Sequence, residues 1–308
     1  MPPDWTWHTF TAADGTNLRW GETGNKAASK ASIIWVPGYT ASFDMYGEHV
    51  DLLARRGYHV IGFDLRGQGG SERSRASHPE KLWVEDFADY SDDLAAFIKS
   101  AGDAKTQPLI LTGISFGGHV SVRTLGDHDV PVDGLYLLAP ALRPNSAPYT
   151  FEQAKRLMTV SRALGKERHY AVGQSDWQPD GLDFTKGSDC SSNPERLYLR
   201  DTLFTRHPEQ RVGGITNQYG AEFFESSEYL LAPGYLEKID LPITMISAEH
   251  DTFVVTDYNS RACSEQFPDC REITPAGTGH CLPQESDAVL TQMFDAMDAL
   301  LMRIGSEK

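Results

Sequence analysis

The sequence predicts an α/β fold, in which a mostly parallel sheet is flanked by helices and carries an inserted, mainly helical cap. Short, continuously apolar runs bounded by Gly, Pro or Asp are typical of strands buried on both faces of a parallel sheet. Segments of helical character alternate with these runs, and one long interval breaks the alternation. The predicted strands cover residues 7–10, 18–20, 33–36, 60–63, 109–111, 135–138 and 243–246.

The remaining elements follow from the same patterns. Asp14-Gly15 predicts a hairpin turn between the first two strands. The expected helices outside the long interval cover residues 46–56, 84–100, 117–125 and 286–304. The interval 143–232 has a helical piece at 151–164 and a Gly-, Ser-, Asp- and Asn-rich middle at 173–193. We interpret it as a cap inserted between two parts of one core, 1–142 and 233–308.

Composition and charge exclude some classes of protein. The 308 residues are 40% hydrophobic and 23% charged, which is typical of a globular chain with one large domain and a subdomain. A net charge of −15 without a basic stripe excludes nucleic acid as a partner. The cap interval holds 11 basic and 12 acidic residues, so it is nearly neutral on an acidic body. Such a cap could touch a membrane surface transiently, although a merely variable surface explains the charge equally well.

The sequence predicts a cytoplasmic location. The first residues lack the basic and apolar regions of a secretory signal, and no apolar run approaches the roughly 20 residues of a membrane-spanning helix. The cysteines lack CxxC spacing and are expected to be free thiols in a reducing compartment. They are Cys190, Cys263, Cys270 and Cys281. A Cys263–Cys270 bridge would require a different compartment.

The strongest motif is Gly113-Ile114-Ser115-Phe116-Gly117, between an apolar strand-like run and a helical segment. A serine between glycines at such a junction is typical of a nucleophile elbow, a turn so tight that only small flanking residues fit. Ser115 is therefore the candidate nucleophile. We refer to residues 113–117 as the elbow.

A serine hydroxyl needs a general base and a carboxylate that orients this base. In the order usual after a nucleophile elbow, acid and then base follow on loops after later strands. Asp251 follows the predicted strand 243–246, and His280 lies in a glycine-rich loop before the last helix. We predict Asp251 as the acid and His280 as the base.

Other residues compete for these roles less well. Glu249 lies too close to the strand end, and Asp257 is expected to cap the next helix. His250 adjoins the acid and is expected to point elsewhere. His119, four residues after Ser115, would project along the helix away from the turn, so a structural role is favoured.

Acyl transfer also needs two donors for the oxyanion. One is expected to be the backbone N–H of Phe116, the residue after the nucleophile. The other is expected to be the backbone N–H of Tyr39, in the loop Val36-Pro37-Gly38-Tyr39-Thr40 after an early strand. Pro-Gly is also an ordinary turn signal, which is the alternative explanation of this loop.

Further motifs carry a family resemblance. They are Phe63-Asp-Leu-Arg-Gly-Gln-Gly-Gly-Ser71, Phe87-Ala-Asp-Tyr-Ser-Asp-Asp-Leu94, Asn193-Pro-Glu-Arg196 and Gly213-Gly-Ile-Thr-Asn-Gln-Tyr219. With the elbow, they make the chain similar to the α/β-hydrolase superfamily, and within it to the lysophospholipase and monoacylglycerol lipase branch, also described as serine aminopeptidase S33-like hydrolases. The chain departs from that branch at Pro37, where a histidine usually precedes the glycine.

This resemblance implies an α/β-hydrolase fold and a serine esterase that cleaves a monoacyl lipid, either a lysophospholipid or a monoacylglycerol, without metal or organic cofactor. The acyl chain is expected against apolar cap residues, although helical spacing of this kind more often serves packing of the cap on the core. The predicted wall comprises Phe151, Leu157, Met158, Phe204, Tyr219, Phe223 and Phe224.

Two alternatives stay open. The same fold also occurs in aminopeptidases and in hydrolases of small non-lipid esters or amides. In an aminopeptidase, Glu195, Glu222 or Glu225 could bind the free amino terminus of a peptide. A non-catalytic binding protein on the same fold is the alternative from another class. Such a protein typically lacks one member of the triad, and here all three are present.

Overall fold

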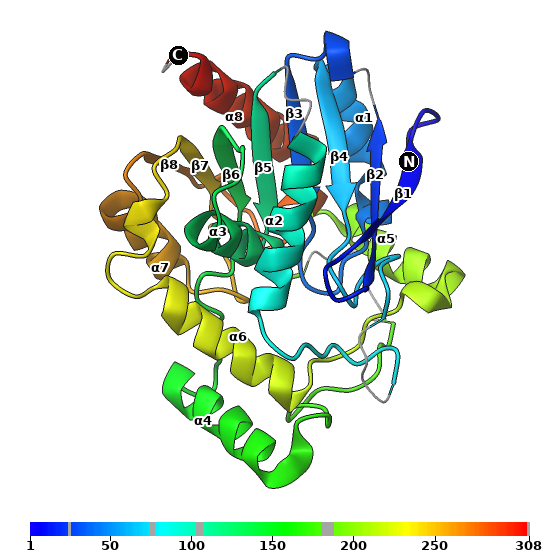
Figure 1. Cartoon of the computed structure of the whole chain (residues 1–308), viewed down its shortest axis with the longest axis vertical. Helices are drawn as coiled ribbons and strands as arrows, with labels where there is room; N and C mark the ends of the chain where they lie inside the picture. Colours follow the sequence, from blue (N-terminus) through cyan, green and yellow to red (C-terminus); the bar gives the residue numbers. More distant parts are fainter. Residues whose placement is uncertain (24–25, 74–77, 103–106, 180–187, 307–308) are drawn as a thin grey trace.

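A twisted central sheet organises the chain (Figure 1). The computed structural model describes residues 1–23, 26–73, 78–102, 107–179 and 188–306, and within them the sheet has eight strands. They are β1 (Thr6–Thr11), β2 (Asn17–Thr23), β3 (Ala31–Val36), β4 (Tyr58–Phe63), β5 (Leu109–Ile114), β6 (Gly134–Leu138), β7 (Ile243–Ile246) and β8 (Cys270–Ile273). Their order across the sheet is β1-β2-β4-β3-β5-β6-β7-β8.

The sheet is mostly parallel. β2 pairs antiparallel with β1 and β4, and all pairs from β4 to β8 are parallel. Every residue of β3 to β7 is buried, as expected for strands covered on both faces. The predicted α/β fold is confirmed, including the hairpin at Gly15, whose φ of 87° suits a tight turn.

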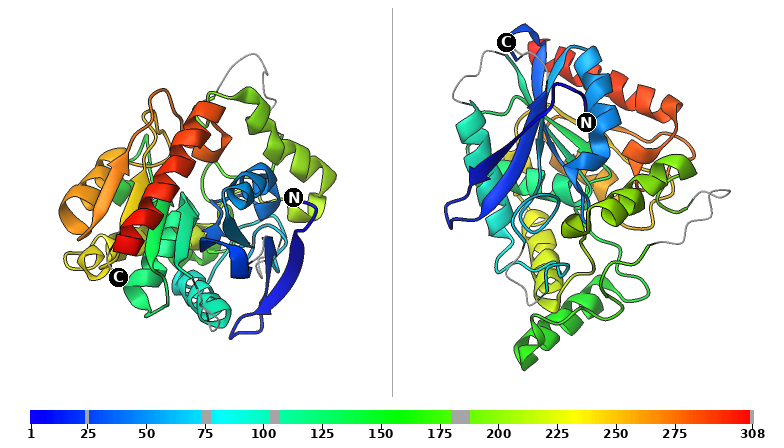
Figure 2. Two further views of the ribbon diagram at one scale, coloured as in Figure 1. Left: turned by 90° about the horizontal axis from the view of Figure 1, so that it is seen from above. Right: turned by 90° about the vertical axis from the view of Figure 1, so that its right-hand side faces the viewer.

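Helices cover both faces of this sheet. They are α1 (Gly47–Arg55), α2 (Ala88–Gly102), α3 (Phe116–Asp127), α4 (Phe151–Ser161), α5 (Pro194–Arg206), α6 (Asn217–Leu230), α7 (Thr256–Arg261) and α8 (Asp287–Ser306). In the right-hand view of Figure 2 the sheet is seen edge-on, with α1 and α8 on one side and α2 on the other. The side chains of α1 and α8 share an apolar cluster with Trp35 and Tyr136, whereas those of α2 and α3 share another with Phe63 and Leu111.

Several elements differ from the sequence-based expectation, and for α5 and α6 in the cap interval no ranges were predicted. The helix predicted from residue 84 begins at Ala88, because the Asp86 carboxylate accepts a hydrogen bond of 2.7 Å from the Ala88 amide and so caps its start. Strand β8 was not predicted. It lies at the sheet edge and contains Arg271 and Glu272, so it lacks a continuous apolar run.

The interval between β6 and β7 carries α4, α5 and α6 (Figure 1). It lies beyond the carboxyl ends of the parallel strands, and α6 stands between the core and α4. The part of the polar stretch at 180–187 lies outside the described residues. The boundaries at 143 and 232 stay a prediction. Among the described helices, none combines the length and apolar character needed to cross a membrane.

The prediction of free thiols was wrong. Cys190 is bonded to Cys281 and Cys263 to Cys270, with Cα–Cα distances of 4.8 and 5.1 Å. Both distances fall in the range that a disulfide requires. Residues 190 and 281 are 91 positions apart, and their proximity comes from the way the cap folds onto the core, which the spacing of cysteines does not encode.

Candidate active site

Ser115 stands at the junction of β5 and α3 in a backbone conformation that non-glycine residues rarely adopt, with φ 49° and ψ −114°. Its glycine neighbours are required by the close packing of this turn. A Cβ at Gly113 would lie 2.5 Å from the carbonyl oxygen of Gly117, and a Cβ at Gly117 would lie 2.3 Å from that of Val36. The elbow therefore presents Ser115 Oγ above the carboxyl end of the sheet.

The predicted acid and base come together with the serine. His280 Nε2 lies 2.8 Å from Ser115 Oγ, and His280 Nδ1 lies 2.7 Å from Asp251 Oδ2. The Asp251 side chain is fully buried, and its other oxygen accepts hydrogen bonds from the amides of Phe253 and Val254 at 2.8 and 3.0 Å. This arrangement can remove a proton from the serine and stabilise the imidazolium that forms.

The competing residues have other partners. A Glu249 oxygen accepts a hydrogen bond of 2.6 Å from the Gly277 amide and so holds the loop that precedes His280. Asp257 lies in the first turn of α7, whose N-cap is Val255 rather than the expected aspartate. His250 is exposed and lies beside Glu249.

His119 is structural, as expected. It is fully buried, with its Nδ1 3.0 Å from the Ala141 carbonyl oxygen and its Nε2 2.7 Å from the Ser226 hydroxyl. Burial lowers the pKa of His119 to about 3, so the ring is neutral at physiological pH. It links α3, which begins at the elbow, to α6 in the cap.

Tyr39 and Phe116, the residues of the two predicted oxyanion donors, line the same cavity as the serine. Phe116 is the first residue of α3, where amides have no partner within the helix. Gly38 approaches the elbow so closely that a Cβ there would contact Ser115 Cβ at 3.5 Å. Tyr39, the next residue, lines the same cavity as Ser115, and its hydroxyl donates a hydrogen bond of 2.9 Å to the carbonyl oxygen of Gly213 in the cap.

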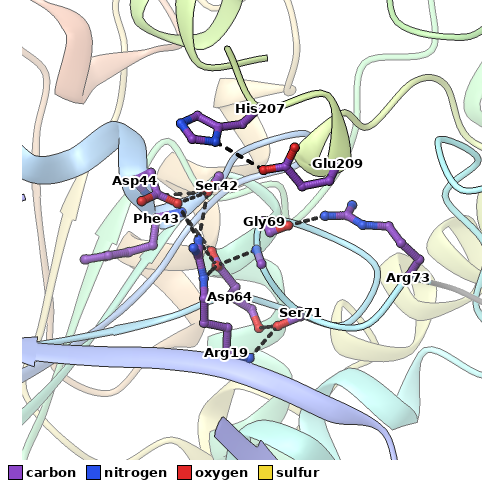
Figure 3. Close-up of polar contacts among 11 residues, drawn as sticks. Arg19, Ser42, Phe43, Asp44, Asp64, Gly69, Ser71, Arg73, His207 and Glu209 are labelled. Carbon is purple, nitrogen blue, oxygen red and sulfur yellow. Dashed lines mark hydrogen bonds and ion pairs between the residues drawn. The ribbon is translucent and has the colours of Figure 1, made fainter. Parts of the chain in front are cut away.

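A buried polar network supports the loop that carries Tyr39. The Gln68 side-chain oxygen accepts a hydrogen bond of 2.6 Å from the Thr40 amide. Nearby, the fully buried carboxylate of Asp64 accepts hydrogen bonds from the Phe43 amide and the Arg19 guanidinium, both at 2.7 Å (Figure 3). In the sequence, residues 63–71 carried only the family resemblance, and these roles of Gln68 and Asp64 were not predicted from it. A charged residue directly after a buried strand was the available signal.

A cavity of about 710 Å³ opens over the serine and is lined by both core and cap. Five of the seven predicted wall residues line it, namely Leu157, Met158, Tyr219, Phe223 and Phe224. Phe151 and Phe204 do not. The Phe151 ring packs on Phe224 with centroids 4.8 Å apart, and the Phe204 ring packs on Trp177 at 5.7 Å. Both are buried by packing within the cap and core, so their predicted place in the wall is corrected.

The acidic cap residues lie away from this cavity. Glu222 and Glu225 form ion pairs with Arg162 at 2.8 and 2.7 Å. Neither these residues nor Glu195 line the cavity, and no carboxylate is found among the described residues of its lining. In the described part of the chain, no group of three or more His, Cys, Asp or Glu side chains is placed to hold a metal ion.

Comparison with known proteins agrees with this geometry. Residues 27–287 match the family described as serine aminopeptidase, S33. The chain belongs to this family. The S33 chain is 28% identical to lysophospholipase L2 of Escherichia coli K12 over 261 residues, which cover 82% of the chain and 73% of the relative. It is 23% identical to a probable lysophospholipase L2 of Haemophilus influenzae, over 90% of the chain and 85% of the relative.

Solved structures share the fold of the S33 chain. A soluble variant of the monoglyceride lipase of Saccharomyces cerevisiae superposes with a TM-score of 0.74 at 18% identity, covering 99% of this chain and 97% of that one. A monoacylglycerol lipase of Paleococcus ferrophilus superposes with a TM-score of 0.68 at 18% identity, covering 92% and 98%. The resemblance to the α/β-hydrolase superfamily is confirmed.

Proposed function

We propose that this S33 hydrolase cleaves a carboxylic ester of a monoacyl lipid, a lysophospholipid or a monoacylglycerol, through an acyl-enzyme on Ser115. The observation that carries the proposal is the unbroken series of hydrogen bonds from Asp251 through His280 to Ser115, which ends in the cavity beneath the cap. The names of the lysophospholipase relatives support the same substrate class.

In the proposed reaction, His280 Nε2 takes the proton of Ser115 as Oγ bonds to the ester carbonyl carbon. Asp251 stabilises the imidazolium, and the amides of Tyr39 and Phe116 bind the oxyanion. The tetrahedral intermediate expels the alcohol, which leaves with the proton from His280. Water then attacks the acyl-enzyme by the reverse route and releases the fatty acid.

The apolar wall favours a lipid over a small polar substrate. Apolar side chains of α4 and α6 line the cavity, namely Leu157, Met158, Phe223 and Phe224. Proteins bind acyl chains by burying them against apolar surface of this kind. Binding of an amino terminus would call for a carboxylate, and the described lining offers none. This contrast disfavours the aminopeptidase alternative.

We also propose that the cap touches the lipid surface transiently. Val160, Leu164 and Val172 are 47%, 69% and 72% exposed on α4 and the segment that follows it, and Val172 also lines the cavity. Exposed apolar side chains on the cap, one of which lines the cavity, suit entry of a lipid from a membrane. We expect a smaller fraction of the Leu164→Asp variant than of the wild type to cosediment with anionic and with neutral vesicles. Hydrolysis of a soluble short-chain ester by this variant should stay unchanged.

The direct test is a panel of monoacylglycerols, lysophospholipids, short aryl esters and aminoacyl arylamides. The wild-type chain should hydrolyse the lipid esters and react with a fluorophosphonate probe. Ser115→Ala should abolish both, whereas the exposed control Ser264→Ala should keep both. Full ester hydrolysis by Ser115→Ala would overturn the mechanism, faster turnover of arylamides would favour an aminopeptidase, and an unlabelled wild-type chain would indicate a binding protein.

The cytoplasmic location stays a prediction, and the two disulfides weigh against it. Cytosolic reductants keep most thiols reduced, so paired cysteines are typical of oxidising compartments. Trapping of free thiols with a mass-tagged alkylating reagent in intact cells tests this point. A cytoplasmic chain with four free thiols should gain four tags, whereas the oxidised chain should gain none.

A further inference from the structure

A cap segment, residues 188–193, runs along the loop that carries His280. The Cys281 amide donates a hydrogen bond of 2.6 Å to the Cys190 carbonyl oxygen, and the His280 amide lies 3.4 Å from that of Asp189. The two backbones are so close that a Cβ at Gly279 would lie 2.7 Å from the Asp189 oxygen. The cap and the predicted base are thus in direct backbone contact.

The contact is covalent at one point. The disulfide Cys190–Cys281 joins the cap segment to the residue directly after His280. Both cysteines line the cavity with the base. Any movement of the cap segment away from the core is therefore transmitted to the loop of His280.

A buried carboxylate reinforces this connection. Glu285 is fully buried, and its side chain accepts hydrogen bonds from the Gly279 amide at 2.8 Å and from the Ser192 amide at 3.2 Å. The Ser192 hydroxyl donates to it as well. Burial of a charge is costly unless hydrogen bonds compensate it, and here the donors come from both sides of the contact. We call Cys190–Cys281 and Glu285, with its partners Gly279 and Ser192, the clamp.

The other side of the loop is held by the core. The Thr278 hydroxyl accepts a hydrogen bond of 3.1 Å from the Glu249 amide, and a Glu249 oxygen accepts the Gly277 amide. His280 lies between these supports in a segment that belongs to no helix or strand. Its backbone is fixed by the core at residues 277 and 278 and by the clamp at Gly279 and Cys281, on either side of it.

We propose that Cys281 and Glu285 are positioning residues for His280, because they fasten the cap to the loop of the base and so fix Nε2 against Ser115. Proton transfer by His280 then depends on an intact Cys190–Cys281 disulfide. The inference rests on the proposed function. Displacement of a reacting group by about 1 Å can cost 10²-fold in rate, and the core support remains, so loss of the clamp should lower kcat about 10- to 100-fold with little change in KM.

The test uses the full-length chain and two double variants that each remove one disulfide. Cys190→Ala/Cys281→Ala opens the clamp. Cys263→Ala/Cys270→Ala is the matched control, because that bridge joins the amino end of β8 to the segment before it, at the opposite end of the strand from His280. Glu285→Gln weakens the clamp while it keeps the disulfide. The measured quantities are kcat and KM on a short aryl ester and the urea midpoint of unfolding.

The proposal is supported if the clamp variants have a lower kcat with nearly constant KM while the control variant keeps the wild-type kcat. Equal kcat in all folded variants would overturn it, as would an equal loss in the control, which would indicate a general effect of losing a disulfide. If wild-type protein is inactive on every ester of the panel, the proposed function fails, and the role of the clamp fails with it.

Reduction gives a second route that does not depend on folding of the cysteine variant. In the Cys263→Ala/Cys270→Ala background, dithiothreitol breaks the S–S bond of Cys190–Cys281, donates two electrons and two protons to form two thiols, and is itself oxidised to its cyclic disulfide. Activity should fall with the appearance of the two thiols and return on reoxidation. Unchanged activity after complete reduction would contradict the proposal.

Discussion

The Gln68 side chain accepts a hydrogen bond of 2.6 Å from the Thr40 amide, so the loop after β4 holds the loop after β3. Thr40 has φ of 56°, an unfavourable conformation for threonine that this bond helps to maintain. We expect Gln68→Ala to lower kcat about tenfold, with less effect on KM, because a displaced Tyr39 amide stabilises the oxyanion less well. Gln292→Ala, on the exposed side of α8, is the control, and equal kinetics of the two variants would contradict this role.

The elbow should tolerate no methyl group at its second glycine. A Cβ at Gly117 would meet the Val36 carbonyl oxygen at 2.3 Å, which neither backbone can avoid without moving. We expect Gly117→Ala to lower the free energy of unfolding by about 2 kcal/mol or more and to abolish ester hydrolysis. Gly305→Ala in α8, where a Cβ meets nothing within 4 Å, should instead leave stability equal or raise it by about 0.5 kcal/mol. Urea unfolding measures both.

His119 should make the fold sensitive to acid. Its pKa is about 3 in the folded chain because of burial, against 6.5 in the unfolded chain. Between these values only the unfolded chain binds the proton, so protonation favours unfolding. The free energy of unfolding therefore has its full value, as far as His119 is concerned, above about pH 6.5. It falls by about 1.4 kcal/mol per pH unit as the pH drops toward 3. Urea midpoints at pH 7 and 5 should fall less steeply for His119→Gln than for wild type. The control His250→Gln, at an exposed histidine, should show the same change of urea midpoint with pH as the wild type. Part of this pH dependence should remain in His119→Gln, because burial also lowers the pKa of His49 to about 4.

Chain-length preference should depend on α4. Met158 of α4 lines the cavity, whereas Met302 of α8 is 70% exposed and does not. Met158→Ala removes apolar contact with a long acyl chain, so we expect kcat/KM for long-chain esters to fall about 3- to 10-fold relative to short-chain esters. Met302→Ala should leave that ratio unchanged. A ratio that is the same in both variants would exclude Met158 from the acyl site.

Local sequence patterns predicted the parts of the site that depend on local structure. Ser115 and Asp251 each follow a predicted strand, and parallel strands bring their carboxyl ends to one edge. His280 was placed by its order along the chain after the acid, because the strand that precedes it was not predicted. The edge strand β8 was missed because Arg271 and Glu272 interrupt its apolar pattern. The parallel strands β3 to β7 were found because burial on both faces leaves a continuous apolar run. The more exposed strands β1 and β2 were found beside the hairpin turn signal at Gly15.

Features that depend on contact between distant segments were not predictable in this way. Phe204 and Phe224 are both aromatic residues on cap helices, yet Phe224 lines the cavity and Phe204 packs on Trp177. Cys190 meets Cys281 only because the cap folds back onto the core. Helical periodicity shows that a face is apolar, but it does not show which neighbour covers it.

The distance along the chain between the nucleophile and the base has a consequence for synthesis. Ser115 and His280 are 165 positions apart, and the residue that follows the base is tied back to the cap. In a chain emerging from the ribosome, Ser115 is therefore present before His280 has been synthesised, and the serine lacks its base until synthesis is nearly complete.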